Sequence, residues 1–139
     1  MLVKLSILMG AVALLVSGTE PSLAKKKKRT RVAIANVASE VRTRIYYVYG
    51  ANPDCSEKPP AIIRITKKPK HGLAEVAIVK GYSNYPKGHQ RHPCNLTLRN
   101  IAAVYYKSNT GYTGRDNISL EWFTKGGGYG RKRYTINVR

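Results

Sequence analysis

The sequence predicts an all-β fold, a single antiparallel β-sandwich of about seven or eight short strands. Apolar and polar residues alternate along several segments, most clearly in "ISLEW" and "YTINV" near the C-terminus. Turn-forming residues separate these segments at intervals of about eight to twelve residues, as is usual in sandwich proteins. After the N-terminal segment, no stretch has the spacing of an amphipathic helix. We therefore expect one β-sandwich domain over residues 32–139.

Residues 1–24 have the layout of a secretory signal peptide. Lys4 precedes an apolar stretch at 5–16, and Ser-Leu-Ala at 22–24 supplies the small residues of a cleavage site. The stretch is shorter than the roughly 20 residues that a membrane span needs. The basic run "KKKKRTR" follows at 25–31, and because positive charge tends to stay on the cytoplasmic side, an uncleaved anchor is the alternative. We expect a secreted or periplasmic protein with a disordered basic tail and no membrane span after cleavage.

The first half of the domain is expected to contain four strands. They are predicted at 31–37, 44–50, 61–66 and 73–79. The first two are rich in β-branched and aromatic residues, and Val32 and Ile34 share one face. The segment 51–60 carries Asn-Pro and Pro-Pro and is expected to form a loop. The short turn "KKPKHG" predicts that the third and fourth strands pair with each other.

The second half begins with a long exposed loop at 81–94, where two glycines and two prolines interrupt any apolar period. Further strands are predicted at 95–100, 101–107, 116–123 and 132–138. The last two place Ile118, Leu120 and Trp122, and then Tyr134, Ile136 and Val138, toward the core. "KGGGYG" between them predicts a hairpin connection.

Cys55 and Cys94 are the only cysteines. An even pair in an exported chain predicts one disulfide bond, with two buried free thiols as the alternative. Closing a loop of about 40 residues would stabilise the fold by roughly 3 to 4 kcal/mol in the chain-entropy model.

The chain is strongly basic, with 25 Lys and Arg against 7 Asp and Glu and a net charge of +18. Such a charge attracts anions over long distances and exceeds what solubility requires. Basic residues gather at 25–31, 64–71 and 131–133, and the 81–94 loop mixes tyrosines with cationic side chains. That mixture suits acidic sugars and also single-stranded nucleic acid. The predicted anion-binding residues are Arg64, Lys67, Lys68, Lys70, His71, Tyr82, Tyr85, Lys87, His89, Arg91 and His92.

Two separated motifs carry a family resemblance. "KPKHGLAEV", and later "VYYKSNTGYTGRDNISLEW" with a terminal "RYTINVR", resemble the cadherin-like and bacterial immunoglobulin-like domains of exported bacterial proteins. The resemblance covers about residues 62–139 and implies a Pro-x-x-Gly turn, a Gly-Tyr-x-Gly-x-Asp corner and a terminal alternating strand. Because such corners recur across sandwich families, the resemblance implies the fold more strongly than any function.

The Gly-Tyr-x-Gly-x-Asp segment reads as a structural corner. Gly111 and Gly114 can adopt positive φ angles, and Tyr112 can pack its ring while its hydroxyl reaches a backbone group. Asp116 can accept hydrogen bonds from turn amides. Calcium, the alternative, needs about six to eight oxygen ligands, and the acidic residues here are few and widely spaced. Where relatives often have Asp-Gly, this chain has Lys125-Gly126, so we expect no metal and no cofactor.

Other chemistry is considered at the histidines. His89, His92 and Cys94 lie close together in the sequence, but a closed metal site needs four ligands and Cys94 is expected in the disulfide. A ribonuclease-like mechanism would need His71 to converge with His89, His92 and Lys87. Neither a nucleophile elbow nor a phosphate-binding loop motif is present in the sequence.

We therefore expect a non-catalytic exported β-sandwich that binds an anionic polymer at the cell envelope. Lipopolysaccharide, an acidic glycan or extracellular nucleic acid would fit the charge. The first alternative is a protein–protein adhesion or assembly module that uses an exposed strand edge. The second is a secreted hydrolase of phosphate esters or glycans.

Overall fold

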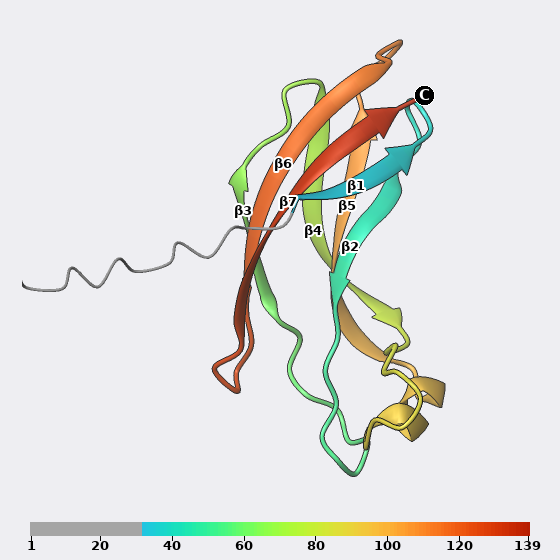
Figure 1. The fold of residues 1–139 in the computed structure, drawn as a ribbon, viewed down its shortest axis with the longest axis vertical. Helices are drawn as coiled ribbons and strands as arrows, with labels where there is room; N and C mark the ends of the chain where they lie inside the picture. The colour runs from blue at the N-terminus through green and yellow to red at the C-terminus, as the bar shows by residue number, and fades with distance from the viewer. Residues whose placement is uncertain (1–31) are drawn as a thin grey trace, which may run out of the picture.

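The computed structural model describes residues 32–139, which form seven strands and one short 3-10 helix (Figure 1). The elements are β1 (Val32–Val37), β2 (Thr43–Val48), β3 (Ile62–Lys67), β4 (Gly72–Gly81), the 3-10 helix η1 (His92–Leu96), β5 (Arg99–Ser108), β6 (Gly114–Phe123) and β7 (Tyr129–Val138). The predicted signal peptide at 1–24 and the predicted tail at 25–31 lie outside the described residues.

The strands form two sheets, as expected for an all-β sandwich. One sheet has the order β1-β7-β6-β3 and the other has the order β2-β5-β4. Most neighbouring strands are antiparallel, but β1 runs parallel to β7, with Val32 opposite Arg133 and Val37 opposite Val138. The purely antiparallel prediction is therefore wrong at this edge. Alternation in a single strand does not encode the direction of its partner, so the sequence pattern could not reveal this pairing.

The predicted pairing of the third and fourth strands is also wrong. β3 pairs with β6, whereas β4 pairs with β5 along its whole length. The turn between β3 and β4 therefore carries the chain from one sheet to the other (Figure 1). The crossing places Ile63 of β3 and Ala74 of β4 against the same core from opposite sheets, which a hairpin between the two strands would not do.

The strand predicted at 95–100 is wrong for 95–98, which contain the end of η1 and a short connection, whereas Arg99 and Asn100 begin β5. Pro93 lies in the first turn of the helix, where its missing N–H is tolerated. The amide of Thr97 donates to the Cys94 carbonyl, which closes the helix. Leu96 and Leu98 are exposed, so the apolar-polar alternation of this segment does not report a buried face.

The core lies between the two sheets. Its buried members are Val37, Ala61, Ile63, Ala102, Val104, Tyr106, Ile118, Leu120, Tyr134, Ile136 and Val138. Trp122 packs against this cluster, so the inward residues predicted for the last two strands are confirmed. Ala33 and Ala35 also pack on the core, which leaves Val32 and Ile34 together on the exposed face of β1. Burial, with a smaller contribution from neighbouring Tyr134, raises the pKa of Tyr46 to about 12.

The β6–β7 hairpin closes through a turn at Thr124–Gly128, as the glycine-rich segment predicts. The amide of Thr124 donates to the Gly128 carbonyl, and the amide of Gly128 donates to the Thr124 hydroxyl. Gly127 has a φ angle of 79°, a conformation that glycine adopts without a side-chain clash. The turn lies at the same end of the sandwich as the long loop that precedes β5 (Figure 1).

Candidate functional site

The predicted anion-binding residues are divided between two parts of the sandwich. Arg64 and Lys67 lie on β3, and Lys68, Lys70 and His71 follow in the β3–β4 turn. The other six follow β4: Tyr82, Tyr85, Lys87, His89 and Arg91 lie in the loop, and His92 begins η1. β4 separates the two groups, and its ten residues span roughly 30 Å. The convergence of His71 with His89 and His92 that a ribonuclease-like site would need is therefore wrong.

Four cationic side chains share the outer face of β3, β6 and β7. Strand pairing places Arg64 opposite Glu121, and Glu121 opposite Arg131. Lys67 is opposite Ser119, and Ser119 is opposite Arg133. Directly opposed residues in neighbouring strands lie on the same face of a sheet. We call the exposed set Arg64, Lys67, Arg131 and Arg133 the basic face.

The dimensions of the basic face follow from sheet geometry. Strands lie about 4.8 Å apart, so the β3 and β7 cations of one row are about 10 Å apart across β6. Residues two apart in a strand are separated by about 7 Å, which is the spacing of the two rows along β7. A hollow of about 360 Å³ contains Lys67, Ser119, Arg131 and Arg133 among its lining residues. The surface is therefore shallow and open to a long ligand.

An aromatic row continues the basic face toward the β6–β7 turn. Ile62 is opposite Phe123, and Phe123 is opposite Tyr129, with the two ring centres 5.0 Å apart. The Arg64 guanidinium lies 5.4 Å from the centre of the Phe123 ring, and that of Arg131 lies 5.5 Å from the Tyr129 ring. These cation–π contacts hold the guanidinium groups over the sheet while leaving them exposed.

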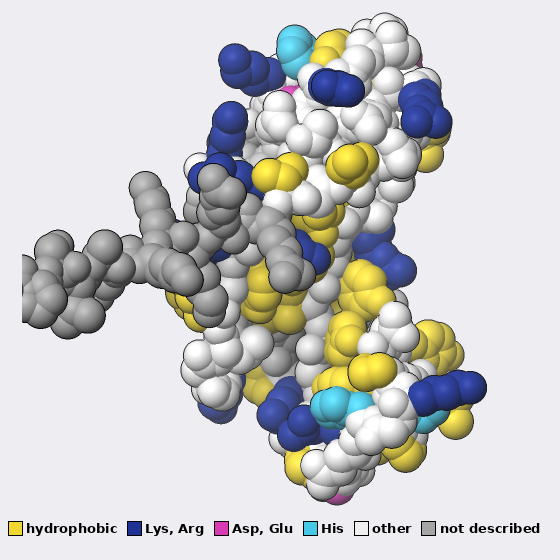
Figure 2. Space-filling view, viewed as in Figure 1, with side chains coloured by type: hydrophobic (Ala, Val, Ile, Leu, Met, Phe, Trp, Pro, Cys, Tyr) yellow, Lys and Arg dark blue, Asp and Glu magenta, His cyan; other side chains and the backbone are white. Residues whose placement is uncertain are grey.

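The carboxylates of the domain are mostly engaged by groups other than cations. Asp54 accepts from Ser56, Glu57 from the Asn100 amide, and Glu40 from the Gly111 amide. Two ion pairs form within residues 32–139, Arg42 with Glu75 and Arg131 with Glu121. Most basic side chains of the described domain therefore have no internal counterion. Figure 2 shows Lys and Arg side chains at both ends of the visible face and few acidic ones.

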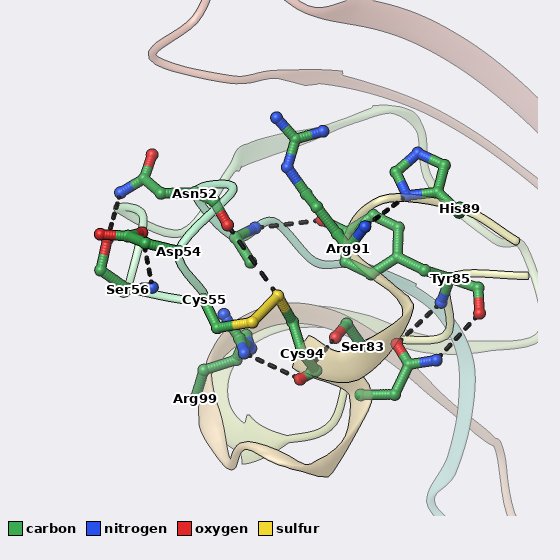
Figure 3. The surroundings of a disulfide bond; sticks show 12 residues. Asn52, Asp54, Cys55, Ser56, Ser83, Tyr85, His89, Arg91, Cys94 and Arg99 are labelled. Atoms are coloured by element: carbon green, nitrogen blue, oxygen red, sulfur yellow. Dashed lines mark hydrogen bonds between the residues drawn. A yellow bond between two sulfur atoms is a disulfide. The ribbon is translucent and has the colours of Figure 1, made fainter.

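The disulfide between Cys55 and Cys94 is confirmed and joins two loops at one end of the sandwich (Figure 3). Tyr85, His89 and Arg91 lie on the same side of the bond in this view. The rings of Tyr85 and His89 are stacked with centres 4.8 Å apart, and His89 Nδ1 accepts a hydrogen bond from the Arg91 amide. Three residues of the predicted loop are therefore held together as one unit.

Arg99 is a buried cation beneath the disulfide. Its side chain is 1% exposed, and Nη2 donates to the Cys94 carbonyl at 2.9 Å. Its Nε and Nη1 atoms make no hydrogen bond within residues 32–139. The same carbonyl also accepts from Ser83 and from the Thr97 amide. The sequence carries no signal that Arg99 is buried, because an arginine at the start of a strand is usually exposed.

The predicted corner lies at the other end of the molecule. Gly111 and Gly114 have φ angles of 71° and 131°, and the Tyr112 hydroxyl donates to the Arg115 carbonyl at 2.8 Å. The Tyr112 ring stacks on the His71 ring with centres 4.3 Å apart. This contact ties the corner to the β3–β4 turn and gives His71 a packing role.

Asp116 joins the corner to the β3–β4 turn. Its carboxylate accepts from the amides of Lys70, His71 and Asn117 at 2.8 to 2.9 Å and from the Tyr106 hydroxyl at 3.2 Å. Burial opposes ionisation of Asp116, but the four hydrogen bonds outweigh it and lower the pKa of this carboxyl. Burial and the nearby carboxylate raise the pKa of Tyr106.

Of the three candidate metal ligands His89, His92 and Cys94, Cys94 forms the disulfide with Cys55. Within residues 32–139, no three His, Cys, Asp or Glu side chains are grouped so that they could hold a metal ion. No helix in this part of the chain is long and apolar enough to cross a membrane.

Two sequence features could have pointed to the basic face. The first is the cluster of positive charge at 131–133. The second is the alternation along this segment, which places Arg131 and Arg133 on the outer face of the strand and Tyr134 on the inner face. Their proximity to Arg64 and Lys67 depends on the pairing of β3 with β6, which the sequence did not predict.

Comparisons with known proteins add little. No family model matches the sequence, and no curated protein matches it. Among solved structures, the solution structure of amebosin aligns with 76% of this chain and 88% of its own, at 10% sequence identity and a TM-score of 0.40. A likeness this weak carries no argument about fold family or function.

Proposed function

We propose that this protein is an exported, non-catalytic binding protein whose basic face holds an anionic polymer at the cell envelope. The observation that carries the proposal is the arrangement of Arg64, Lys67, Arg131 and Arg133 in two rows on one open sheet face. Glu121 is the one carboxylate between them, and it contacts Arg131 at 3.7 Å. Lipopolysaccharide, acidic glycans and nucleic acid all offer repeated charges to such a surface.

Multiple weak contacts give such a surface its affinity. An exposed ion pair contributes little alone, about 0 to 1 kcal/mol, so a single anion would be held poorly. A polymer presents several anions at high effective concentration, which makes the contacts cooperative. Ser119 and the neighbouring Asn117 and Thr135 add neutral hydrogen-bonding groups beside the cations. Phe123 and Tyr129 add aromatic surface at one end of the rows.

The strand order supports an immunoglobulin-like or cadherin-like classification as part of the proposal. If β2, β5 and β4 correspond to strands B, E and D, then β3, β6 and β7 correspond to C, F and G. β1 would then correspond to strand A, which here pairs in parallel with the last strand, β7. The disulfide supports export, because such bonds persist in oxidising compartments.

Salt-dependent binding tests this function. The purified protein is applied to immobilised heparin, lipopolysaccharide and single-stranded DNA, and eluted with a sodium chloride gradient. The Lys67→Gln/Arg133→Gln variant is expected to elute earlier and to lower the slope of log affinity against log salt by about one per cation removed. A variant lacking residues 25–31, run in parallel, separates the contribution of the predicted tail.

The matched control is Lys80→Gln/Lys107→Gln, which removes the same charge from exposed positions on β4 and β5. If binding is local to the basic face, the control keeps most of the affinity. Equal losses in both variants would mean that only the total charge matters, and retention that does not change up to about 0.5 M salt would exclude an electrostatic mechanism.

A second candidate function is protein–protein assembly through the edge of β4. This strand pairs on one side only, with β5, and it exposes Val76 and Ile78. An exposed apolar edge can accept a strand from another chain. Ile78→Lys would block such pairing without affecting the basic face. If the partner is a second copy of this chain, size-exclusion chromatography with light scattering would show an oligomer for the wild-type protein and a monomer for the variant.

A further inference from the structure

A cleft of about 510 Å³ lies beside the disulfide, at the end of the sandwich, and is separate from the basic face. Three segments far apart in the sequence line it. Lys58 and Pro59 come from the loop before β3, Tyr85 and Arg91 from the loop after β4, and Lys125 from the β6–β7 turn. Its size falls within the range of small-molecule binding sites, about 300 to 1,000 Å³.

The charge of the cleft is one-sided. Lys58, Arg91 and Lys125 contribute three cations, and no carboxylate is among the lining residues. The Arg91 Nε atom is buried and makes no hydrogen bond within residues 32–139. Because solvent does not reach Nε, the outer Nη atoms of the guanidinium are the donors that an anionic oxygen in the cleft would meet. Figure 3 shows the Arg91 guanidinium directed away from the disulfide, with its far end unpaired among the residues drawn.

The wall of the cleft on the side of the disulfide is fixed before any ligand binds. The disulfide joins the loop of Lys58 to the loop of Arg91. The Tyr85 hydroxyl accepts from the Ala51 amide, and the Tyr49 hydroxyl donates to the Asn84 carbonyl. The Asn95 side chain pairs with both backbone groups of Tyr85, at 2.9 Å each. Such preorganisation reduces the ordering cost of binding.

The Tyr85 ring offers little open surface on which a nucleic-acid base could stack. His89 covers one face of the Tyr85 ring, and Tyr49 packs on Tyr85 in a T-shaped contact with centres 5.1 Å apart. Base stacking needs an open ring face. Val48, Pro59 and Ala61 add apolar lining, so the cleft combines cations with a weakly polar wall.

We propose that this cleft binds a single anionic sugar unit, with its phosphate or carboxylate among Lys58, Arg91 and Lys125 and its ring against the Tyr49 and Pro59 side. The unit is either a free sugar phosphate or sugar acid, or the end of a glycan chain. This site does not depend on the basic face, because none of Arg64, Lys67, Arg131 and Arg133 lines it.

Calorimetric titration of the purified protein tests the site. Glucose 6-phosphate and galacturonic acid are the two anionic probes, with inorganic phosphate, glucose and adenosine 5′-monophosphate as comparisons. We expect at least one anionic sugar to bind about tenfold more tightly than inorganic phosphate or glucose, because the cations and the apolar wall act together. Comparison with a glycan carrying the same terminal unit then distinguishes a free sugar from a chain end.

Two single variants locate the binding. Arg91→Gln and Lys125→Gln are each expected to weaken the sugar about tenfold, and the exposed Lys125 in a turn can be changed without disturbing the core. The Lys67→Gln/Arg133→Gln variant keeps full affinity for the sugar, which separates this site from the basic face. Tighter binding of the nucleotide than of both anionic sugars, or binding unchanged in Lys125→Gln, would overturn the proposal. So would the absence of saturable binding by the wild-type protein.

Discussion

Asp116 is the residue whose surroundings explain the most about the fold. It is 2% exposed, yet it remains ionised because three backbone amides and one hydroxyl donate to it. Two of those amides belong to the turn between β3 and β4, where the chain changes sheets. A buried carboxylate is therefore the partner for backbone groups that no strand could pair.

Asp116→Asn is expected to lower the free energy of unfolding by about 2 to 3 kcal/mol at neutral pH, because one acceptor oxygen is replaced by an amide donor. The folded-state pKa of Asp116 lies below its unfolded value, so the stabilisation is complete above the unfolded pKa. It is lost as pH falls through the lower, folded pKa. Urea unfolding of both proteins from neutral pH to about pH 2 should show the difference shrinking in acid.

The control for this prediction is Asp54→Asn. Ser56 donates to Asp54 from both its hydroxyl and its amide, and these bonds lower the pKa of Asp54, but the carboxylate is exposed in a loop. Replacing the Asp54 carboxylate should therefore leave the free energy of unfolding near the wild-type value. A difference between Asp116→Asn and wild type that stays constant down to the lowest pH would contradict the assignment.

The sequence motif identified Asp116, Gly111, Gly114 and Tyr112, because corner geometry is local and its residues lie within six positions of one another. Arg99 had no such signal. Its burial depends on the loop after β4 folding over it and on the Cys94 carbonyl, contacts that only the folded chain creates. Residue type and local spacing predicted the corner and the disulfide, whereas the contacts that bury Arg99 arise only in the folded chain.

At the scale of elements, the β6–β7 hairpin is tightly packed between Gly130 and Trp122, whereas its turn at Gly126 and Gly127 has free space around it. Gly130 is opposite Trp122, and a side-chain carbon at position 130 would overlap the indole ring. Trp122 in turn contacts the Tyr46 ring, with centres 5.5 Å apart. The glycine therefore allows the only tryptophan of the chain to lie across the hairpin and reach the core.

Gly130→Ala is expected to lower the free energy of unfolding by about 1 to 3 kcal/mol, because a rigid ring must move to make room. The matched control is Gly126→Ala in the adjacent turn, where an added carbon would meet no atom within 4 Å. Urea unfolding monitored by the fluorescence of Trp122 measures both. Equal midpoints for the two variants would mean that the indole has another place to lie.

The elements also show which sequence patterns were informative. Alternation located all four strands of the β1-β7-β6-β3 sheet and identified the inward side of β6 and β7. The short turn at 67–72 suggested the wrong partner for β3, and a strand was predicted over 95–98, where the 3-10 helix ends and a short connection leads to β5. Alternation reports a face that repeats every two residues, but it does not report what covers that face.

At the scale of the whole molecule, positive charge is the dominant electrostatic feature. The chain carries a net charge of +18, and residues 32–139 contain two ion pairs. Repulsion among like charges opposes the compact state. The binding surfaces proposed above would relieve this repulsion by accepting anions, so stability and binding depend on the same residues.

Added salt is therefore expected to stabilise the free protein. Raising sodium chloride from about 0.02 to about 0.2 M shortens the screening length from above 20 Å to below 10 Å, which weakens repulsion across the molecule. The thermal unfolding midpoint should rise over this range. Lys67→Gln/Arg133→Gln should raise the midpoint at low salt and change it much less at high salt, because the removed repulsion is then already screened. Circular dichroism melts of the two proteins at both salt concentrations measure this difference.

A wild-type midpoint that falls with salt would contradict this prediction. It would mean that the two ion pairs stabilise the fold more than the repulsion destabilises it, and the basic face would then carry no net repulsion that an anionic polymer could reduce.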